Sequence, residues 1–599
     1  MSATTFREVA LAFFTLLLQQ SPNGFQDTVL TRNPQNLLET YDFIVVGGGS
    51  AGSTLANRLS EILSWKVLLL EAGGQENDFT KTPVMYPMLQ SSQYDWNYTT
   101  TVQKDTCQAT NGQCAFPRGK LLGGSSSINA MIYTRGYKSD YDKWGQENCG
   151  WSFKDVEPYF LKSEGNRIPG LKGHGRSGPL TVSNAPYKTT LGDQLVRAGI
   201  LKGLRYTDCP DYEGNCILHT MSTIRDGIRC SASTAYLEPI STKRPNLHII
   251  TNAEVNRVII ENNRAKGVEF TNKGKSSQVF ASREVVVTAG AIGSPKILML
   301  SGVGPKNHLE SLRIKVLSDL PVGDNLQDHT RVTMFYEVSQ DSATNVNTFA
   351  DRYAQEQYLG SQTGPYSYSG VEALAWVRVG QQNRRTISLA KKLLGTSPNL
   401  EPPNVQYHIS SVVGVQKYIA AISTTVTRPK SIGSIRLNST NPQGNPLIDV
   451  NYYGDKRDWQ VTLDGLKFSD ELFQSQPFLT VGATLVKAFH PLCAKISDFT
   501  EYLNCIIKYY TMTMYHPVGT VKMGSKSRGG VVNRKLQVYG VNGLRVVDAS
   551  IAPTLISMNT NAMAIMIGEK GADIIKADNG INTKIKMPIC YRRKRFSQG

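Results

Sequence analysis

A glycine-rich turn between an apolar strand and a helix constrains this chain more than any other feature. Residues 41–46 (YDFIVV) are β-branched and aromatic, which predicts a buried strand. Gly-Gly-Gly-Ser-Ala-Gly follows at residues 47–52, and residues 53–63 (STLANRLSEIL) have helical spacing. The GxGxxG pattern is weak alone. A strand before it and a helix after it are typical of a dinucleotide-binding βαβ unit.

The residues of this turn have separate roles in such a unit. We expect Gly47 to make the tight turn, Gly49 to let the backbone approach a pyrophosphate, and Gly52 to let the helix pack on the strand. Ser50 and Ala51 lie in the same turn and are expected to contact the cofactor. The helix N-terminus then faces the phosphates, where its dipole and free N–H groups favour negative charge.

A second predicted strand at residues 66–70 ends in Glu71, at about 20 residues after Gly52. A carboxylate at this place accepts hydrogen bonds from ribose hydroxyls and would repel a 2′-phosphate, which disfavours NADP. A surface glutamate at the end of a strand is the structural alternative. This unit alone leaves NAD and FAD both open.

Four later segments resemble signatures of the glucose-methanol-choline (GMC) oxidoreductases. They are residues 119–136 (GKLLGGSSSINAMIYTRG), 290–304 (GAIGSPKILMLSGVG), 516–524 (HPVGTVKMG) and 546–561 (VVDASIAPTLISMNTN). The resemblance runs from about residue 40 to about residue 575. It is a family of FAD-dependent alcohol oxidases and dehydrogenases, so the resemblance implies FAD rather than NAD.

The resemblance implies a set of contacts to the flavin ring. Gly123 and Ser126 belong to a small-residue loop that lets the backbone approach the isoalloxazine closely, with Leu122 beside them. Asn129 is expected to contact the flavin through its amide, and turn capping is its structural alternative. Some family members bind the flavin covalently through a histidine in this loop. Ile128 occupies that position here, so we expect non-covalent FAD.

Further cofactor contacts are implied outside that loop. Val255 would touch the adenine, and residues 289–290 would lie near the adenosine half of the flavin. Asp548 and Ala549 would contact the pyrophosphate and ribityl region. Asn561 would help to hold the pyrimidine side, and a structural role at a helix N-terminus is its alternative.

Two residues are expected to carry the chemistry. A histidine holds and releases a proton near neutral pH, so His516 is predicted to be the base that takes the hydroxyl proton. A buried structural histidine is the alternative. The family pairs this residue with a histidine or an asparagine, and Asn559 stands at that position. An amide takes no proton, so Asn559 should donate a hydrogen bond to the substrate oxygen. We expect no metal.

The predicted fold class is α/β (α+β overall), with a Rossmann-like FAD-binding domain and a discontinuous sheet-plus-helix substrate domain. Within the second domain the sequence predicts strands at residues 405–411 and 434–437 and a helix at residues 455–475. The expected divisions are a signal peptide at 1–20, the FAD-binding domain at 40–330 (chiefly 40–180 and 225–330), the substrate domain at 331–514, a return to the FAD domain at 515–575, and a basic tail at 576–599.

Charge and hydropathy limit the partners. The formal net charge is +17, and six basic side chains without an acid lie between residues 584 and 595. The remaining body is only mildly basic, which does not indicate a nucleic-acid-binding protein. No run of apolar residues reaches the roughly 18 that a membrane span needs. The oligomeric state is left open.

Several features favour secretion. Residues 9–18 (VALAFFTLLL) follow Arg7 and have the length of a signal-peptide core, although an amphipathic N-terminus is the alternative. Asn97 and Asn438 begin N-glycosylation triplets. Nine cysteines leave at least one thiol unpaired. Three close pairs lack metal-site spacing and suit disulfides in a secreted protein: Cys107/Cys114, Cys209/Cys216 and Cys493/Cys505.

The substrate is the least constrained expectation. The motif segments of the chain most resemble those of insect members of the family, which include glucose dehydrogenase-like enzymes and ecdysone oxidase. Val521 stands where we expect many insect members to carry cysteine, which disfavours the central glucose dehydrogenase group. An ecdysone oxidase-like activity on a secondary ring hydroxyl, with oxygen as acceptor, is the first expectation, and the sequence leaves oxygen and a quinone both open as acceptors. A glucose dehydrogenase-like activity with a quinone is the alternative. A non-catalytic secreted flavin- or ligand-binding protein and a nicotinamide dehydrogenase are alternatives of other classes.

Overall fold

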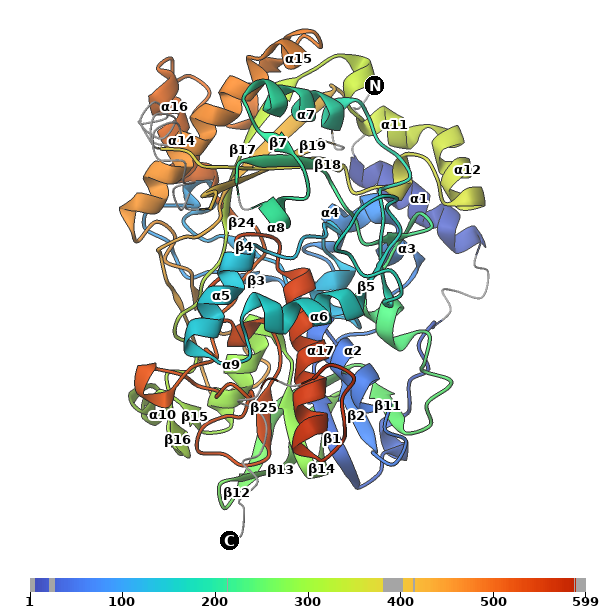
Figure 1. Ribbon diagram of the computed structural model, residues 1–599, viewed down its shortest axis with the longest axis vertical. Helices are drawn as coiled ribbons and strands as arrows, with labels where there is room; N and C mark the ends of the chain where they lie inside the picture. Colours follow the sequence, from blue (N-terminus) through green and yellow to red (C-terminus); the bar gives the residue numbers. More distant parts are fainter. Residues whose placement is uncertain are drawn as a thin grey trace.

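The computed structural model describes residues 6–20, 27–212, 214–380, 402–412, 415–586 and 588. Two β-sheets lie toward opposite ends of its long axis, and helices cover both (Figure 1). The predicted fold class is confirmed: one sheet is Rossmann-like and the other belongs to a mixed sheet-and-helix domain.

The nucleotide-type sheet has the strand order β11-β2-β1-β14-β13-β12, with β25 paired to β14. A parallel core of five strands forms its centre: β1 (Thr40–Val46), β2 (Val67–Leu70), β11 (Leu247–Ile250), β25 (Leu544–Val546) and the second half of β14 (Lys275–Val287). The first half of β14 continues into an antiparallel meander with β13 (Arg264–Asn272) and β12 (Ala253–Glu261). Strands buried on both faces explain why β1 and β2 are nearly continuous apolar runs.

Helix α2 (Ser50–Leu59) follows β1 and packs very closely on it. A Cβ atom built on Gly52 would lie 1.9 Å from the carbonyl oxygen of Gly47, so only glycine fits between helix and strand. On its other side α2 meets α17 (Asn561–Asp578), where a Cβ on Gly568 would lie 2.6 Å from the Ala51 carbonyl oxygen. The helix begins three residues before the predicted start because the glycine-rich turn itself forms its first turn.

The second sheet has the order β23-β17-β20-β19-β18-β8-β7, with β24 paired to β17. Its strands are β7 (Arg205–Tyr206), β8 (Cys216–His219), β17 (Thr330–Glu337), β18 (Val371–Val377), β19 (Val405–Ser411), β20 (Ile419–Val426), β23 (Thr484–Leu485) and β24 (Met512–Thr513). Predicted strands 405–411 and 434–437 are β19 and β21 (Ser434–Arg436), and predicted helix 455–475 is α14 (Lys456–Phe473).

Other helices surround the two sheets. Helix α9 (Gly290–Leu300) follows β14 directly and turns the chain over the parallel core. The longer remaining ones are α5 (Lys138–Glu147), α6 (Phe153–Ser163), α7 (Leu191–Leu201), α12 (Arg352–Ser361) and α16 (Phe499–Tyr510).

The N-terminal segment forms helix α1 (Phe6–Gln20), which buries one apolar face. Phe13 is fully buried and stacks on Tyr366 at a centroid distance of 4.2 Å. Among the described residues, no helix combines the length and apolar character needed to cross a bilayer. The basic cluster at residues 591–595 lies outside the described residues.

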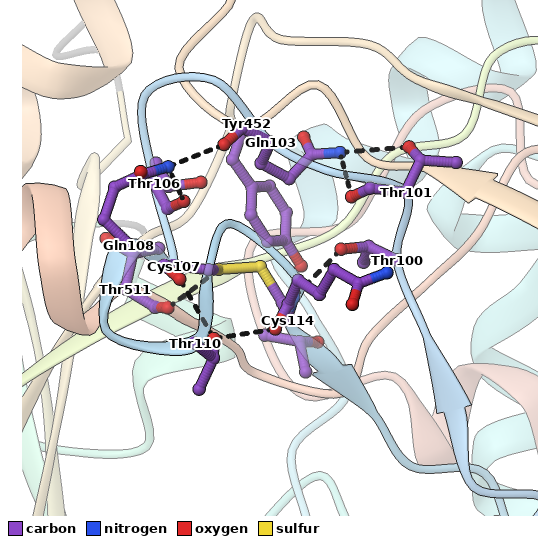
Figure 2. The surroundings of a disulfide bond; sticks show 12 residues. Thr100, Thr101, Gln103, Thr106, Cys107, Gln108, Thr110, Cys114, Tyr452 and Thr511 are labelled. Carbon is purple, nitrogen blue, oxygen red and sulfur yellow. Dashed lines mark hydrogen bonds between the residues drawn. A yellow bond between two sulfur atoms is a disulfide. The ribbon is translucent and has the colours of Figure 1, made fainter.

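All three close cysteine pairs form disulfides, and Cys230 is a buried free thiol. Figure 2 shows the Cys107–Cys114 bond closing a loop beside Tyr452 and Thr511. The hydroxyl of Tyr452 donates to Asp328 at 2.5 Å. This loop therefore packs behind the segment that carries His516, whose backbone N–H also donates to Asp328.

Candidate active site

A cavity of about 290 Å³ opens between the two sheets, where the parallel strands end. Ligands of open α/β sheets bind beyond the carboxyl ends of the strands, and this cavity begins there. Twelve of the predicted site residues line it: Gly47, Gly49, Ser50, Ala51, Glu71, Asn129, Val255, His516, Asp548, Ala549, Asn559 and Asn561. It therefore runs from the nucleotide fingerprint to the predicted catalytic pair.

The N-terminus of α2 borders this cavity. Gly49 is the N-cap residue and supplies no side-chain cap, so the first N–H groups of the helix keep their hydrogen-bonding capacity. A Cβ atom on Gly49 would meet nothing closer than the Gly124 Cα at 3.9 Å. The Ser50 hydroxyl donates to the Asn561 side-chain oxygen at 2.7 Å and ties α2 to the start of α17. The wall here is made of backbone and suits an anionic group.

Glu71 lies at the end of β2 and is buried. One carboxylate oxygen accepts the Gly48 N–H at 2.7 Å and the other accepts the Gly73 N–H at 2.8 Å. Burial raises the pKa of Glu71 to about 7, although these N–H groups favour the charged form. Each oxygen keeps a further acceptor site for a hydroxyl group in the cavity.

Asp548 follows β25 and is also buried. Its carboxylate accepts hydrogen bonds from the Gly290 N–H at 2.9 Å, the Ser294 hydroxyl at 2.5 Å and the Ser550 N–H at 2.8 Å. Burial raises its pKa above the usual value. Asp548 thereby fixes the turn after β14 to the turn after β25, which places both turns on one side of the cavity.

Some residues of the loop at 122–129 line the cavity, and others only hold the loop in shape. Leu122, Gly123 and Ser126, like Gly52, do not line the cavity; the Ser126 hydroxyl donates to the Gly123 carbonyl at 2.6 Å. Their contact with a cofactor stays a prediction. Asn129 lines the cavity, and its side-chain oxygen also caps the turn by accepting the Met131 N–H at 2.9 Å. Both roles foreseen for Asn129 are thus compatible.

His516 and Asn559 meet at the far end of the cavity. His516 Nε2 lies 3.2 Å from Asn559 Nδ2, and the oxygen of Asn559 accepts a hydrogen bond from Gln406 at 3.1 Å. Burial lowers the pKa of His516 well below its usual value, and the neighbouring His329, His408 and Arg118 lower it further. The imidazole is therefore neutral near pH 7 and can accept a proton.

Two more histidines join this pair, and sequence reasoning missed both. His329 Nδ1 lies 2.9 Å from His516 Nδ1. Burial lowers the pKa of His329 to about 4 and that of His408 to about 3. Within the described part of the chain, neither ring nitrogen of His408 has a partner in hydrogen-bonding geometry, although Asn559 lies close enough to raise its pKa. The alternation of apolar and polar residues in 405–410 (VQYHIS) predicts a polar face for this strand, and that pattern was the available signal.

The polar face of the second sheet forms the wall beside the histidines. Strand register pairs His408 and Thr333 with Ser423, and Arg331 with Thr425, so these side chains share one face. Arg331, His408, Ser410 and Ser423 line the cavity. The Arg331 side chain donates to the Tyr515 hydroxyl at 2.8 Å, and its buried Nε–H has no partner among the described residues.

Three other residues that line the cavity are not among the predicted site residues. Trp96 stacks on Tyr98 with a centroid distance of 5.7 Å, and Lys296 forms an ion pair with Glu254 at 3.6 Å. Arg118 is half-buried and donates to the Ser125 hydroxyl at 2.6 Å. Trp96 and Lys296 add an aromatic surface and a cation to the nucleotide part of the cavity, whereas Arg118 lies near His516 and lowers its pKa.

Comparison with known proteins gives a consistent result. Family models described as GMC oxidoreductase match residues 41–331 and 429–568. Glucose dehydrogenase [FAD, quinone] of Drosophila pseudoobscura pseudoobscura is 36% identical over 562 residues, covering 90% of this chain and 87% of the relative. Ecdysone oxidase of Bombyx mori is 35% identical, with 90% and 82% covered. An oxygen-dependent choline dehydrogenase of Sinorhizobium fredii is 36% identical, with 89% and 95% covered.

Solved structures agree with these relatives. Formate oxidase of Aspergillus oryzae has a TM-score of 0.81 and 27% identity, covering 90% of this chain and 99% of that one. A FAD-dependent oxidoreductase from Chaetomium thermophilum has a TM-score of 0.79 and 28% identity, with 90% and 100% covered. The chain therefore belongs to the GMC oxidoreductases, a family of enzymes that typically use FAD to oxidise alcohols at a CH–OH group.

Proposed function

We propose that His516 and Asn559 catalyse the alcohol oxidation, and that the substrate is an uncharged alcohol with several oxygen atoms. An ecdysone-like steroid with a secondary ring hydroxyl is the first candidate. The observation that carries this proposal is the buried His516 imidazole, hydrogen-bonded to Asn559 at 3.2 Å, in a wall with further unpaired polar groups.

The residues present fit FAD. The backbone cradle at Gly49 leaves room for a pyrophosphate, and the uncapped start of α2 favours its charge. Glu71 would accept the ribose hydroxyls, and Val255 with Trp96 would hold the adenine. Asp548, Ala549 and Asn561 would hold the middle and pyrimidine side of the cofactor. Ile128 supports non-covalent binding because its side chain forms no bond to a flavin. Bound FAD supplies the acceptor for the hydride that leaves the substrate carbon.

The two catalytic side chains have different tasks. His516 Nε2 would accept the proton of the substrate hydroxyl, which makes the carbon–hydrogen bond easier to break. The Asn559 amide N–H would donate to the same oxygen and stabilise the negative charge that develops there. The substrate loses a hydride and a proton and becomes a carbonyl compound. Because both residues are buried, little water reaches the substrate oxygen while its negative charge develops.

The cavity wall supports an oxygen-rich, uncharged substrate. Arg331, Ser410 and Ser423 offer donors and acceptors along one sheet face. The cavity is also lined by apolar side chains, namely Met131, Ile132, Val371 and Met514. A steroid with hydroxyl groups has both kinds of surface, which favours it over glucose, the second candidate.

The charges of the cavity disfavour a quaternary ammonium substrate such as choline. Considering only described residues, the lining carboxylates are Glu71, Glu254 and Asp548, all of which belong to the nucleotide part. The part beside His516 carries Arg331 instead. A cationic substrate would meet a guanidinium without a compensating carboxylate, which costs Coulomb energy in a buried site.

A panel of alcohols tests this proposal. The purified holoprotein is mixed anaerobically with ecdysone, glucose, choline and an aryl alcohol, and loss of flavin absorbance is followed. We expect ecdysone to reduce the flavin fastest and choline to be inactive. Faster reduction by choline than by ecdysone or glucose would overturn the substrate class. Hydrogen peroxide formed after air is admitted would identify oxygen as the acceptor, and turnover only with a quinone would identify a dehydrogenase.

We also propose that the protein is secreted. The three disulfides and the exposed Asn97 and Asn438 support an oxidising, glycosylating compartment. Loss of residues 1–20 would uncover Tyr366 and its neighbours, on which α1 packs. Expression in a secretory host, followed by N-terminal sequencing and endoglycosidase treatment, tests this. A glycan-free protein retained in the cells would contradict it.

A further inference from the structure

His329 stands directly before β17 and is fully buried against His516. The two rings are nearly perpendicular, at 83° with centroids 5.1 Å apart, and their Nδ1 atoms are 2.9 Å apart. At that distance one nitrogen must carry the hydrogen and the other the lone pair. The question is which of the two rings donates.

The other side of His329 answers this question. Its Nε2 lies 3.0 Å from the carbonyl oxygen of Thr427. A carbonyl oxygen only accepts, so Nε2 carries the hydrogen. Burial keeps the His329 ring neutral near pH 7, because the pKa of His329 is lowered to about 4. A neutral imidazole with hydrogen on Nε2 has its lone pair on Nδ1. His516 must therefore be the donor, through Nδ1–H.

We propose that His329 is a positioning residue that fixes His516 in its Nδ1–H tautomer, which leaves the lone pair of His516 Nε2 facing Asn559 and the cavity. This inference rests on the proposed function only where it makes Nε2 the base. The opposite tautomer would put a hydrogen on Nε2 and leave His516 unable to take the substrate proton there.

The neighbouring residue holds the same histidine from its backbone. Asp328 accepts the His516 N–H at 2.8 Å and is itself fixed by the Thr513 hydroxyl at 2.6 Å. Burial raises the pKa of Asp328 to about 6. Asp328 thus fixes the position of the His516 backbone, and the neighbouring His329 fixes the tautomer of the His516 ring.

The charged groups that act on His329 come from other elements. Asp140 in α5 and Arg428 after β20 form an ion pair at 2.8 Å, so their effects on the ring largely cancel. His408 and Arg118 act on His516 and disfavour its protonated form. Burial, the largest influence on both rings, keeps them neutral, and His408 and Arg118 reinforce this at His516.

The first test reads the tautomer without a substrate. The holoprotein is labelled with ¹⁵N-histidine, and the His516 signals are assigned by their loss in His516→Ala. At pH 8 we expect the Nδ1 shift of a protonated nitrogen and the Nε2 shift of an unprotonated one. The reverse pattern in the wild-type protein would overturn the proposal, whatever the substrate is.

The second test compares two variants at His329. His329→Asn keeps an acceptor near the former Nδ1, whereas His329→Leu removes it. With equal FAD content, we expect flavin reduction in His329→Leu to slow at least tenfold and its pH profile to shift, while His329→Asn stays within about threefold of wild type. Wild-type rates in His329→Leu, or equal loss in both variants, would overturn the proposal. If His329→Leu does not fold, a tenfold loss in His329→Asn would do so.

Discussion

Two glycines of the fingerprint allow the cofactor cavity and the helix packing to be perturbed separately. A Cβ at Gly52 would lie 1.9 Å from the Gly47 carbonyl oxygen and 2.6 Å from the Thr288 hydroxyl. Even a 3.0 Å contact is rare, so α2 would have to move by more than 1.1 Å (3.0 − 1.9). Gly568 of α17 closes the other side of α2, so this movement has no free space.

We expect Gly52→Ala to destabilise the apoprotein by about 3 kcal/mol or more, as severe overpacking does. Gly49→Ala is the matched control. Its Cβ would meet nothing within 3.9 Å, and its backbone has φ −74°, so the apoprotein should change by less than about 0.5 kcal/mol. The same methyl group occupies the place where we expect the pyrophosphate, so FAD affinity should fall by about 100-fold.

Thermal unfolding with and without FAD separates the two effects. At a free FAD concentration of 100 times the wild-type Kd, binding stabilises the wild type by about 2.7 kcal/mol. A 100-fold weaker Kd leaves about 0.4 kcal/mol in Gly49→Ala. Gly52→Ala should unfold earlier even without FAD. A normal apoprotein midpoint in Gly52→Ala would refute the packing argument, and wild-type FAD stabilisation in Gly49→Ala would refute the placement of the pyrophosphate.

Three further predictions concern catalysis. Asn559→Ala should lower kcat by about 100-fold with FAD retained, whereas Asn559→His should keep measurable turnover. Steady-state kinetics that show both variants equally inactive would disprove this. Arg331→Gln should raise KM for an oxygen-rich alcohol by about tenfold with little change in kcat, since a charged donor is lost; an unchanged KM would remove Arg331 from substrate recognition. Because burial lowers the pKa of His516, the basic form persists as pH falls, so kcat/KM should be constant above pH 6.5 and decline only below it; an inflection above pH 7 would contradict this.

The local elements that carry strong patterns were predictable from the sequence. Strand β19 has the bounds expected for residues 405–411, because its apolar and polar residues alternate. The turn at Gly47 and the helix after it were predictable because the tight turn between strand and helix requires glycine. The start of α2 was placed too late, because glycine and serine have low helix propensity although the turn they form belongs to the helix.

The long-range part of the site was not predictable from one sequence. His329 and His516 are 187 positions apart in the chain, and the pairing of β17 with β24, together with the bridge between Gln327 and Val518, brings their segments together. The unpaired state of His408 depends likewise on burial by other elements. The family motifs located His516 and Asn559. The residues beside them, His329 and His408, lie outside these motifs, so the motifs do not identify them.

Anaerobic flavin reduction in His516→Ala tests the central claim most directly. The variant and the wild type are loaded with equal amounts of FAD and mixed with the alcohol that reduces the wild type fastest, and the loss of flavin absorbance is timed. We predict that reduction in the variant is slower by about a thousandfold, because the substrate proton has no acceptor. Reduction at the wild-type rate, with FAD content unchanged, would contradict the assignment of His516 as the base.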